Sequence, residues 1–175
     1  AELAGATAET LRNVELVKRL GANVAIAYAA RHPELDALIA MSPGHLPETK
    51  EMVKHTKKGI DKAKERIAQG KGAKRCLFFD RVQGWSVPMR TTPEIFLSYF
   101  DPEGPAVMPK NAMAMKEVPF LYAVGTQDPI FVRGPEYVFT LAAKHPKSRY
   151  VKADAGHTGT PKAVRKDIVN WLKSL

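Results

Sequence analysis

The last third of the sequence predicts an α/β protein with a parallel sheet flanked by helices. Residues 118–125 form an apolar run with the length and composition of a buried strand, and residues 148–153 indicate a second strand. A helical pattern over residues 134–145 lies between them, and a second helical pattern runs from Thr160 to the end of the sequence. Strand, helix, strand and helix at this spacing predict a parallel βαβ unit with a right-handed crossover.

The first part of the sequence predicts a helix followed by another strand. Apolar residues recur at helical spacing within residues 7–31 and form one stripe: Leu11, Val14, Val17, Leu20, Val24 and Tyr28. Pro33 ends this helix, because the residue before a proline is pushed out of the α region. The short apolar run at residues 35–42 then indicates a buried strand.

The middle of the sequence carries most of the positive charge. Residues 48–75 contain ten Lys or Arg against four Asp or Glu, in a chain whose net charge is +9. Val53, Ile60 and Ile67 recur there at helical spacing, so we expect a helix with basic residues on its other faces. The simplest interpretation is a solvated helix. The alternative is a basic face that docks on an acidic partner or an anionic membrane surface, whereas nucleic acid is not favoured, because no interleaved aromatic residues or binding motif accompany the charge.

The segment after the basic helix shows no clear period. We expect irregular structure or short strands over residues 76–92, and a helix that begins at Pro93 with Thr92 as its cap. Trp85 and Phe100 are expected to pack in a core or under a lid. Hydrophobic residues make up 45% of the chain and no apolar run approaches the roughly 20 residues of a membrane span, so we expect a soluble globular protein.

Asp128 and His157 follow the two strands of the C-terminal βαβ unit. Functional groups gather at the carboxyl ends of parallel strands, so these two side chains can meet at one edge of the sheet. An aspartate that accepts from a histidine N–H fixes the tautomer of the ring and supports the imidazolium, as in a Ser-His-Asp triad. The spacing also allows a simpler interpretation, in which Asp128 is a turn residue before Pro129 and His157 is a loop residue beside Gly156.

The order of these segments resembles the α/β-hydrolase fold. The stretches "VPFLYAVGTQDPI" and "SRYVKADAGHTGTP" are similar to its last two strands, and "LGANVAIAYAARHPELDALIAMSPGH" is similar to the helix after its nucleophile elbow and the next strand. More narrowly, "PGHLP … TTPEIFLSYFDPEGP … VGTQDP" is similar to a group of bacterial α/β-hydrolase proteins. The resemblance covers residues 14–175. It implies serine-type hydrolysis of an ester or related acyl bond, with Asp128 as the acid, His157 as the base and no cofactor, in a bacterial protein of the cytoplasm or periplasm.

The resemblance departs from the family pattern at the nucleophile. The elbow motif is G-x-S-x-G, and alignment back from Gly21 places its serine on Arg19 and its first glycine on Val17. Arginine stays protonated and is not a nucleophile, so we expect the chain to be inactive alone. The backbone N–H of Leu20 would be one oxyanion donor, and the second would come from an earlier loop. Ser42 is the alternative nucleophile, although a strand-end turn residue is its simpler interpretation. The histidines show no metal-ligand spacing.

The segments that precede the elbow in the resembling family have no counterpart in this sequence. We expect one domain over residues 1–175 that lacks the N-terminal half of the fold, with residues 46–117 as a helical cap-like insertion. At most Val14–Val17 would remain of the central strand, and the sheet would end in an open edge. Three interpretations stay open: another copy or a partner chain covers the edge, the protein is a truncated pseudoenzyme that works by binding, or the true elbow has been lost from the sequence.

Overall fold

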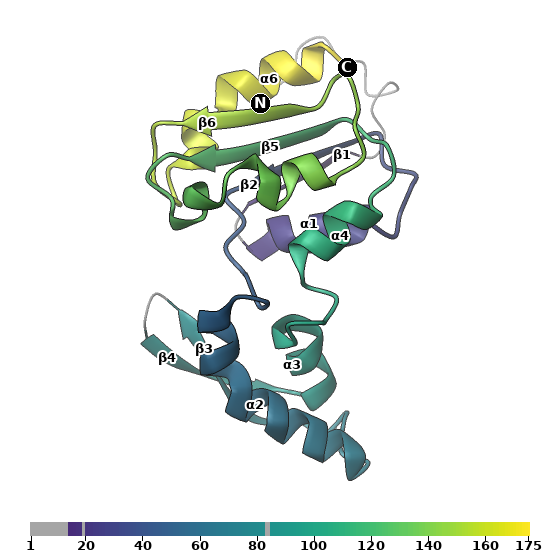
Figure 1. Cartoon of the computed structure of the whole chain (residues 1–175), viewed down its shortest axis with the longest axis vertical. Helices are drawn as coiled ribbons and strands as arrows, with labels where there is room; N and C mark the ends of the chain where they lie inside the picture. The colour runs from purple at the N-terminus through teal and green to yellow at the C-terminus, as the bar shows by residue number, and fades with distance from the viewer. Residues whose placement is uncertain (1–13, 19, 83–84) are drawn as a thin grey trace. The chain divides into compact units, whose positions relative to one another are not determined.

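The structure is a computed structural model that describes residues 14–18, 20–82 and 85–175. They form two compact units (Figure 1). The first, which we call the sheet unit, combines the described residues up to His45 with Met108–Leu175, and the second, the hairpin unit, is Leu46–Val107. No helix in the described part of the chain combines the length and the apolar character that crossing a bilayer requires.

The sheet unit is built on a four-stranded parallel sheet in the order β1-β2-β5-β6. Its strands are β1 (Val14–Lys18), β2 (Ala37–Met41), β5 (Phe120–Gly125) and β6 (Arg149–Ala153). Lys18 pairs with Met41, and Gly125 with Ala153, so the carboxyl ends of the strands share one edge. The helix predicted across residues 14–18 is wrong, because this segment pairs in parallel with β2. The strand agrees with the alternative that the resemblance implied, in which this segment is the remnant of a central strand. Residues 7–13 lie outside the described part of the chain.

Helices cover both faces of the sheet (Figure 1). They are α1 (Leu20–Ala29), α4 (Met108–Ala114), α5 (Thr160–Ala163) and α6 (Arg165–Lys173). On one face Ile39 and Leu121 pack with Trp171 of α6 in a buried cluster. α1 packs on β2, and α4 packs in turn on α1. The predicted insertion ran to residue 117, whereas the hairpin unit ends at Val107, because α4 belongs with α1.

The buried side of α1 differs from the predicted stripe. Val24 is 61% exposed and Tyr28 is 41% exposed, whereas Ala22, Ala25 and Ile26 are buried. The packed side therefore consists mainly of alanines, which let the helix approach the sheet closely, together with Ile26.

The connection from β5 to β6 is not the α-helix predicted over residues 134–145. It consists of three short 3₁₀ helices: η1 (Pro129–Arg133), η2 (Pro135–Tyr137) and η3 (Phe139–Leu141). Gly134, with φ of +65°, separates η1 from η2, and Val138, with φ of −138° and ψ of −52°, separates η2 from η3, so no continuous α-helix forms. Phe139 then packs its ring near those of Phe120 and Tyr150, with centroids 5.8 and 5.7 Å away.

The hairpin unit packs two helices on an antiparallel pair of strands. These are α2 (Lys50–Ala68), α3 (Pro93–Phe100), β3 (Cys76–Val82) and β4 (Trp85–Thr91). The rings of Phe78, Phe96 and Phe100 stack in its core, with centroids 4.2 and 4.6 Å apart. Gly59 of α2 makes room for them, since a Cβ there would lie 2.6 Å from Cζ of Phe96. Thr92 caps α3 as predicted, because its side chain accepts from the N–H of Ile95.

Of the two alternatives expected over residues 76–92, the structure has the strands: residues 76–82 and 85–91 form a regular ladder in which Cys76 pairs with Thr91. One expectation for the hairpin unit needs correction. Trp85, expected in a core or under a lid, is 78% exposed, whereas Phe100 is fully buried as expected. The hairpin pattern is hard to see in the sequence, because charged residues interrupt the alternation on both strands.

Candidate active site

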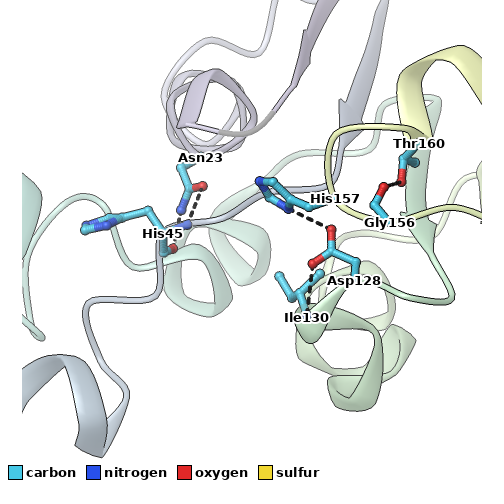
Figure 2. Close-up of polar contacts among 7 residues, drawn as sticks. All are labelled: Asn23, His45, Asp128, Ile130, Gly156, His157 and Thr160. Carbon is cyan, nitrogen blue, oxygen red and sulfur yellow. Dashed lines mark hydrogen bonds and ion pairs between the residues drawn. The ribbon is translucent and has the colours of Figure 1, made fainter. Parts of the chain in front are cut away.

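Asp128 and His157 meet at the carboxyl edge of the sheet (Figure 2). Oδ2 of Asp128 lies 2.8 Å from Nδ1 of His157, a hydrogen-bond distance that also makes an ion pair when the ring is protonated. The Asp128 side chain is 3% exposed and that of His157 is 30% exposed. A buried carboxylate therefore holds one ring nitrogen of a histidine whose side chain reaches the solvent.

Backbone groups fix the Asp128 carboxylate on its other side. Asp128 is the cap of η1, and its Oδ1 accepts from the N–H of Ile130 at 3.1 Å. Its own N–H donates to the carbonyl of Gly125 at 3.0 Å. One oxygen is thus held by the backbone and the other by His157, which leaves the carboxylate little freedom to rotate.

The loop that carries His157 is tied to the end of β5. The N–H of Thr126 donates to Ala153, and the N–H of Gln127 donates to Ala155, at 2.8 and 3.1 Å. Gly125 is needed at this point, because a Cβ there would lie 2.6 Å from Oγ1 of Thr160 and closer still to the carbonyl oxygen of Ala155. The turn that presents His157 therefore lies directly against the strand that presents Asp128.

Gly44 lies against the free edge of the imidazole. A Cβ built on Gly44 would be 2.9 Å from Cε1 and 3.2 Å from Nε2 of His157. Because Nδ1 faces Asp128, Nε2 is the nitrogen left to exchange a proton with a substrate or nucleophile. A side chain at position 44 would displace the ring, so the glycine leaves the space that the imidazole occupies.

The side chain of Asn23 in α1 makes two hydrogen bonds to the backbone of His45, the residue after Gly44. Its amide nitrogen donates to the carbonyl of His45 at 2.5 Å, and its amide oxygen accepts from the N–H of His45 at 3.4 Å (Figure 2). Asn23 is 2% exposed and His45 is 5% exposed, so the contact is buried. The sequence analysis missed Asn23 and Gly44. No local pattern in the sequence marks this contact, because Asn23 bonds to a residue 22 positions away.

Of the two positions that the sequence offered for the nucleophile, the structure describes Ser42 alone. Ser42 follows β2 with φ of +43° and is fully buried. Its hydroxyl makes no hydrogen bond within the described residues, so it is not bonded to Nε2 of His157. Arg19 lies outside the described residues, between the end of β1 at Lys18 and the start of α1 at Leu20.

A buried tyrosine lies near the pair. Burial raises the pKa of Tyr122 above its usual value, and the neighbouring Tyr150 and the Asp128 carboxylate raise it further. Tyr122 therefore remains a neutral phenol at neutral pH. Its strand, β5, is buried along its whole length.

The parallel sheet with helices on both faces, and acidic and histidine loops after its last two strands, define an α/β-hydrolase fold. Solved structures agree. The chain matches a monoacylglycerol lipase from Paleococcus ferrophilus at 22% identity and a TM-score of 0.60, covering 92% of this chain and 68% of that one. It matches the α/β hydrolase GrgF from Penicillium sp. sh18 at 13% identity and a TM-score of 0.64, covering 92% of this chain and 63% of that one.

A third similar structure is the esterase domain of a Rhodothermus marinus protein, at 16% identity and a TM-score of 0.55, with 92% of this chain and 60% of that one covered. The chain thus spans about 60–68% of the length of these three structures. No protein-family model and no curated protein matches the sequence. The likeness establishes a partial α/β-hydrolase fold.

Proposed function

We propose that this chain carries the acid and base of a serine-type hydrolase of esters or related acyl compounds. The observation that supports this is the 2.8 Å contact between Nδ1 of His157 and a buried Asp128 carboxylate. In this role Nε2 accepts the proton of an attacking hydroxyl, Asp128 stabilises the imidazolium, and the proton then passes to the leaving alcohol.

The chain alone is not expected to hydrolyse esters. In the alignment Arg19 takes the place of the nucleophile, and a guanidinium has no lone pair to attack an acyl carbon at any accessible pH. Val17 replaces the first elbow glycine, which a tight strand-to-helix turn requires. The backbone N–H of Leu20 would serve as one oxyanion donor in an elbow with serine at position 19.

A fluorophosphonate probe tests this proposal. The wild-type chain should not be labelled, whereas Val17→Gly/Arg19→Ser should be labelled at position 19. Adding His157→Ala should abolish that labelling, because the serine then has no base. Labelling of the wild type that depends on His157 would show a nucleophile elsewhere in the chain. A double variant that folds and is not labelled would mean that position 19 is not the nucleophile position.

The alternative is a non-catalytic subunit that binds through the open edge of its sheet. Among the described strands β1 pairs with β2 alone, so its outer row of backbone groups is available to another copy or to a partner chain. We propose that such pairing makes the protein an oligomer. Analytical ultracentrifugation tests this, and a monodisperse 19.3 kDa species with cooperative unfolding would count against it.

A further inference from the structure

One face of the β3–β4 hairpin is apolar at its centre and exposed. Leu77 pairs with Arg90, and Phe79 pairs with Pro88, so these four residues share one side of the ribbon, which we call the outer face. Leu77 is 48% exposed and Phe79 is 55% exposed. Pro88 and Arg90 are also exposed. The opposite side carries Phe78 into the core of the hairpin unit.

Positive charge borders this apolar centre. Arg90 lies across from Leu77, and the exposed Arg75 directly precedes the first residue of β3. Asp80 is the acidic residue of the two strands, and the alternation places it on the other side, where its charge acts on Tyr99. Within the described residues of the hairpin, the outer face therefore combines apolar side chains with arginine and holds no carboxylate.

Trp85 stands at the start of β4, beside the turn of the hairpin, and is 78% exposed. Trp85 pairs with Val82, and the alternation places it on the same side as Phe78 and Met89, opposite to Leu77 and Phe79. The exposed indole is therefore not part of the outer face.

We propose that the outer face of the hairpin docks on an anionic lipid surface. Leu77, Phe79 and Pro88 enter the boundary between headgroups and acyl chains, and Arg75 and Arg90 bind lipid phosphates, to which a guanidinium donates two hydrogen bonds at once. This docking does not depend on ester hydrolysis. It also moves the contact with an anionic surface from the helix over residues 48–75, where the sequence suggested it, to the strands that follow.

The charge and composition of the outer face favour lipid over two other occupants. A second copy would bring Arg90 near its own counterpart in a chain of net charge +9, so like charges would oppose pairing. Single-stranded nucleic acid needs aromatic rings on which its bases stack. The centre of the outer face offers Phe79 for that purpose, whereas Leu77 and Pro88 are aliphatic and suit hydrocarbon.

Vesicle co-sedimentation of the full chain tests the proposal. Wild-type protein should bind vesicles of phosphatidylcholine mixed with phosphatidylglycerol, and bind vesicles of phosphatidylcholine alone far more weakly. Leu77→Ser/Phe79→Ser should lower partitioning at least about tenfold, because two side chains no longer leave water. Arg75→Gln/Arg90→Gln should lower it on the order of tenfold, since each basic residue near such a surface contributes about 1 kcal/mol.

Two matched controls separate the hairpin from the rest of the chain. Lys54→Gln/Lys58→Gln removes the same charge from the exposed side of α2 and should leave partitioning nearly unchanged. Ile95→Ser removes a side chain of similar exposure, 57%, from α3 and should also have little effect.

Three results would overturn the proposal. The first is no binding, or equal binding to both kinds of vesicle. The second is loss of vesicle binding in Lys54→Gln/Lys58→Gln while Arg75→Gln/Arg90→Gln binds as the wild type does. That result would mean that α2, and not the hairpin, contacts the lipid. The third is a protein that does not bind vesicles but that self-associates, or binds a single-stranded oligonucleotide, in a manner that depends on Phe79.

Discussion

The two β structures of this chain are covered differently. In the sheet unit β2 and β5 are buried along their whole length, with helices on both faces. In the hairpin unit Phe78 packs inward while its neighbours Leu77 and Phe79 remain exposed. Parallel sheets need cover on both faces, whereas an antiparallel pair can leave one face open. The first arrangement gives a rigid support for the His157 and Asp128 loops, and the second leaves a surface free for docking.

The largest expected effect separates the stabilities of the two units. Phe96 is fully buried between Phe78 and Phe100, so Phe96→Ala should cost about 3–5 kcal/mol of unfolding free energy in the hairpin unit. Native-state hydrogen exchange should show this loss over β3 and little change over β5. Ile95→Ala, 57% exposed on the same helix, is the control and should change stability by under about 0.5 kcal/mol. Equal loss in β3 and β5 would mean that the two units unfold as one.

The next effect tests the close packing of the sheet unit. Gly125→Ala should lower the unfolding free energy by about 3 kcal/mol, because its methyl group would meet the carbonyl of Ala155 and the hydroxyl of Thr160. The low-field NMR signal of the Nδ1 proton of His157 should weaken as the loop moves. Gly156→Ala is the matched control in the same turn, since no atom lies within 4 Å of a Cβ built there. Similar losses in the two variants would argue against close packing as the cause.

A smaller effect is expected at the two hydrogen bonds between Asn23 of α1 and the backbone of His45. Asn23→Ala removes both hydrogen bonds to the backbone of His45 inside a buried region and should cost about 2 kcal/mol. In the Val17→Gly/Arg19→Ser background it should also slow fluorophosphonate labelling, because Gly44 no longer holds the imidazole. Gln127→Ala breaks an exposed bond to Asp154 and serves as the control, with little change in either measurement. Labelling at an unchanged rate would leave Asn23 a purely structural role.

The smallest effect appears only at alkaline pH. Burial raises the pKa of Tyr122 in the sheet unit and that of Tyr99 in the hairpin unit, so each holds its proton more tightly in the folded state. The stability gained is complete below about pH 10, the value for an unfolded tyrosine, and is lost as the pH rises toward the folded value.

Tyr122→Phe should therefore reduce the alkaline loss of stability over β5, and Tyr99→Phe the loss over β3, by up to about 1.4 kcal/mol per pH unit. Hydrogen exchange from pH 9 to 11, corrected for its intrinsic rate, measures both variants and makes each the control for the other. Identical profiles in the wild type and both variants would exclude the two phenols as the source of alkaline unfolding.

Much of the fold follows from local sequence patterns. The strand pattern after residue 118 and the loops that follow it were enough to predict that Asp128 and His157 lie at one edge of a sheet. The basic segment and Thr92 likewise predicted α2 and α3. These predictions succeed because strand ends and helix caps depend on neighbouring residues. Catalytic roles for Asp128, His157 and Arg19 remain predictions.

The errors fall where long-range contacts decide the structure. Residues 14–18 have an apolar spacing that suits a helix, and their pairing with β2 makes them a strand. Val138 leaves the helical region inside the pattern predicted over residues 134–145, and no local feature of the sequence reveals this. Asn23 and Gly44 act on residues that are distant in sequence, so no local period could have identified them.

The edge strand β1 has a consequence for symmetry. All its described pairing is parallel, and a parallel neighbour at that edge would come from a crossover connection, from a head-to-tail copy of this chain or from a different chain. Two identical chains related by a twofold axis would instead pair β1 with its own copy in antiparallel fashion. A dimer of this type would have one continuous sheet whose strand direction reverses at the axis, with its two imidazole sites at opposite ends.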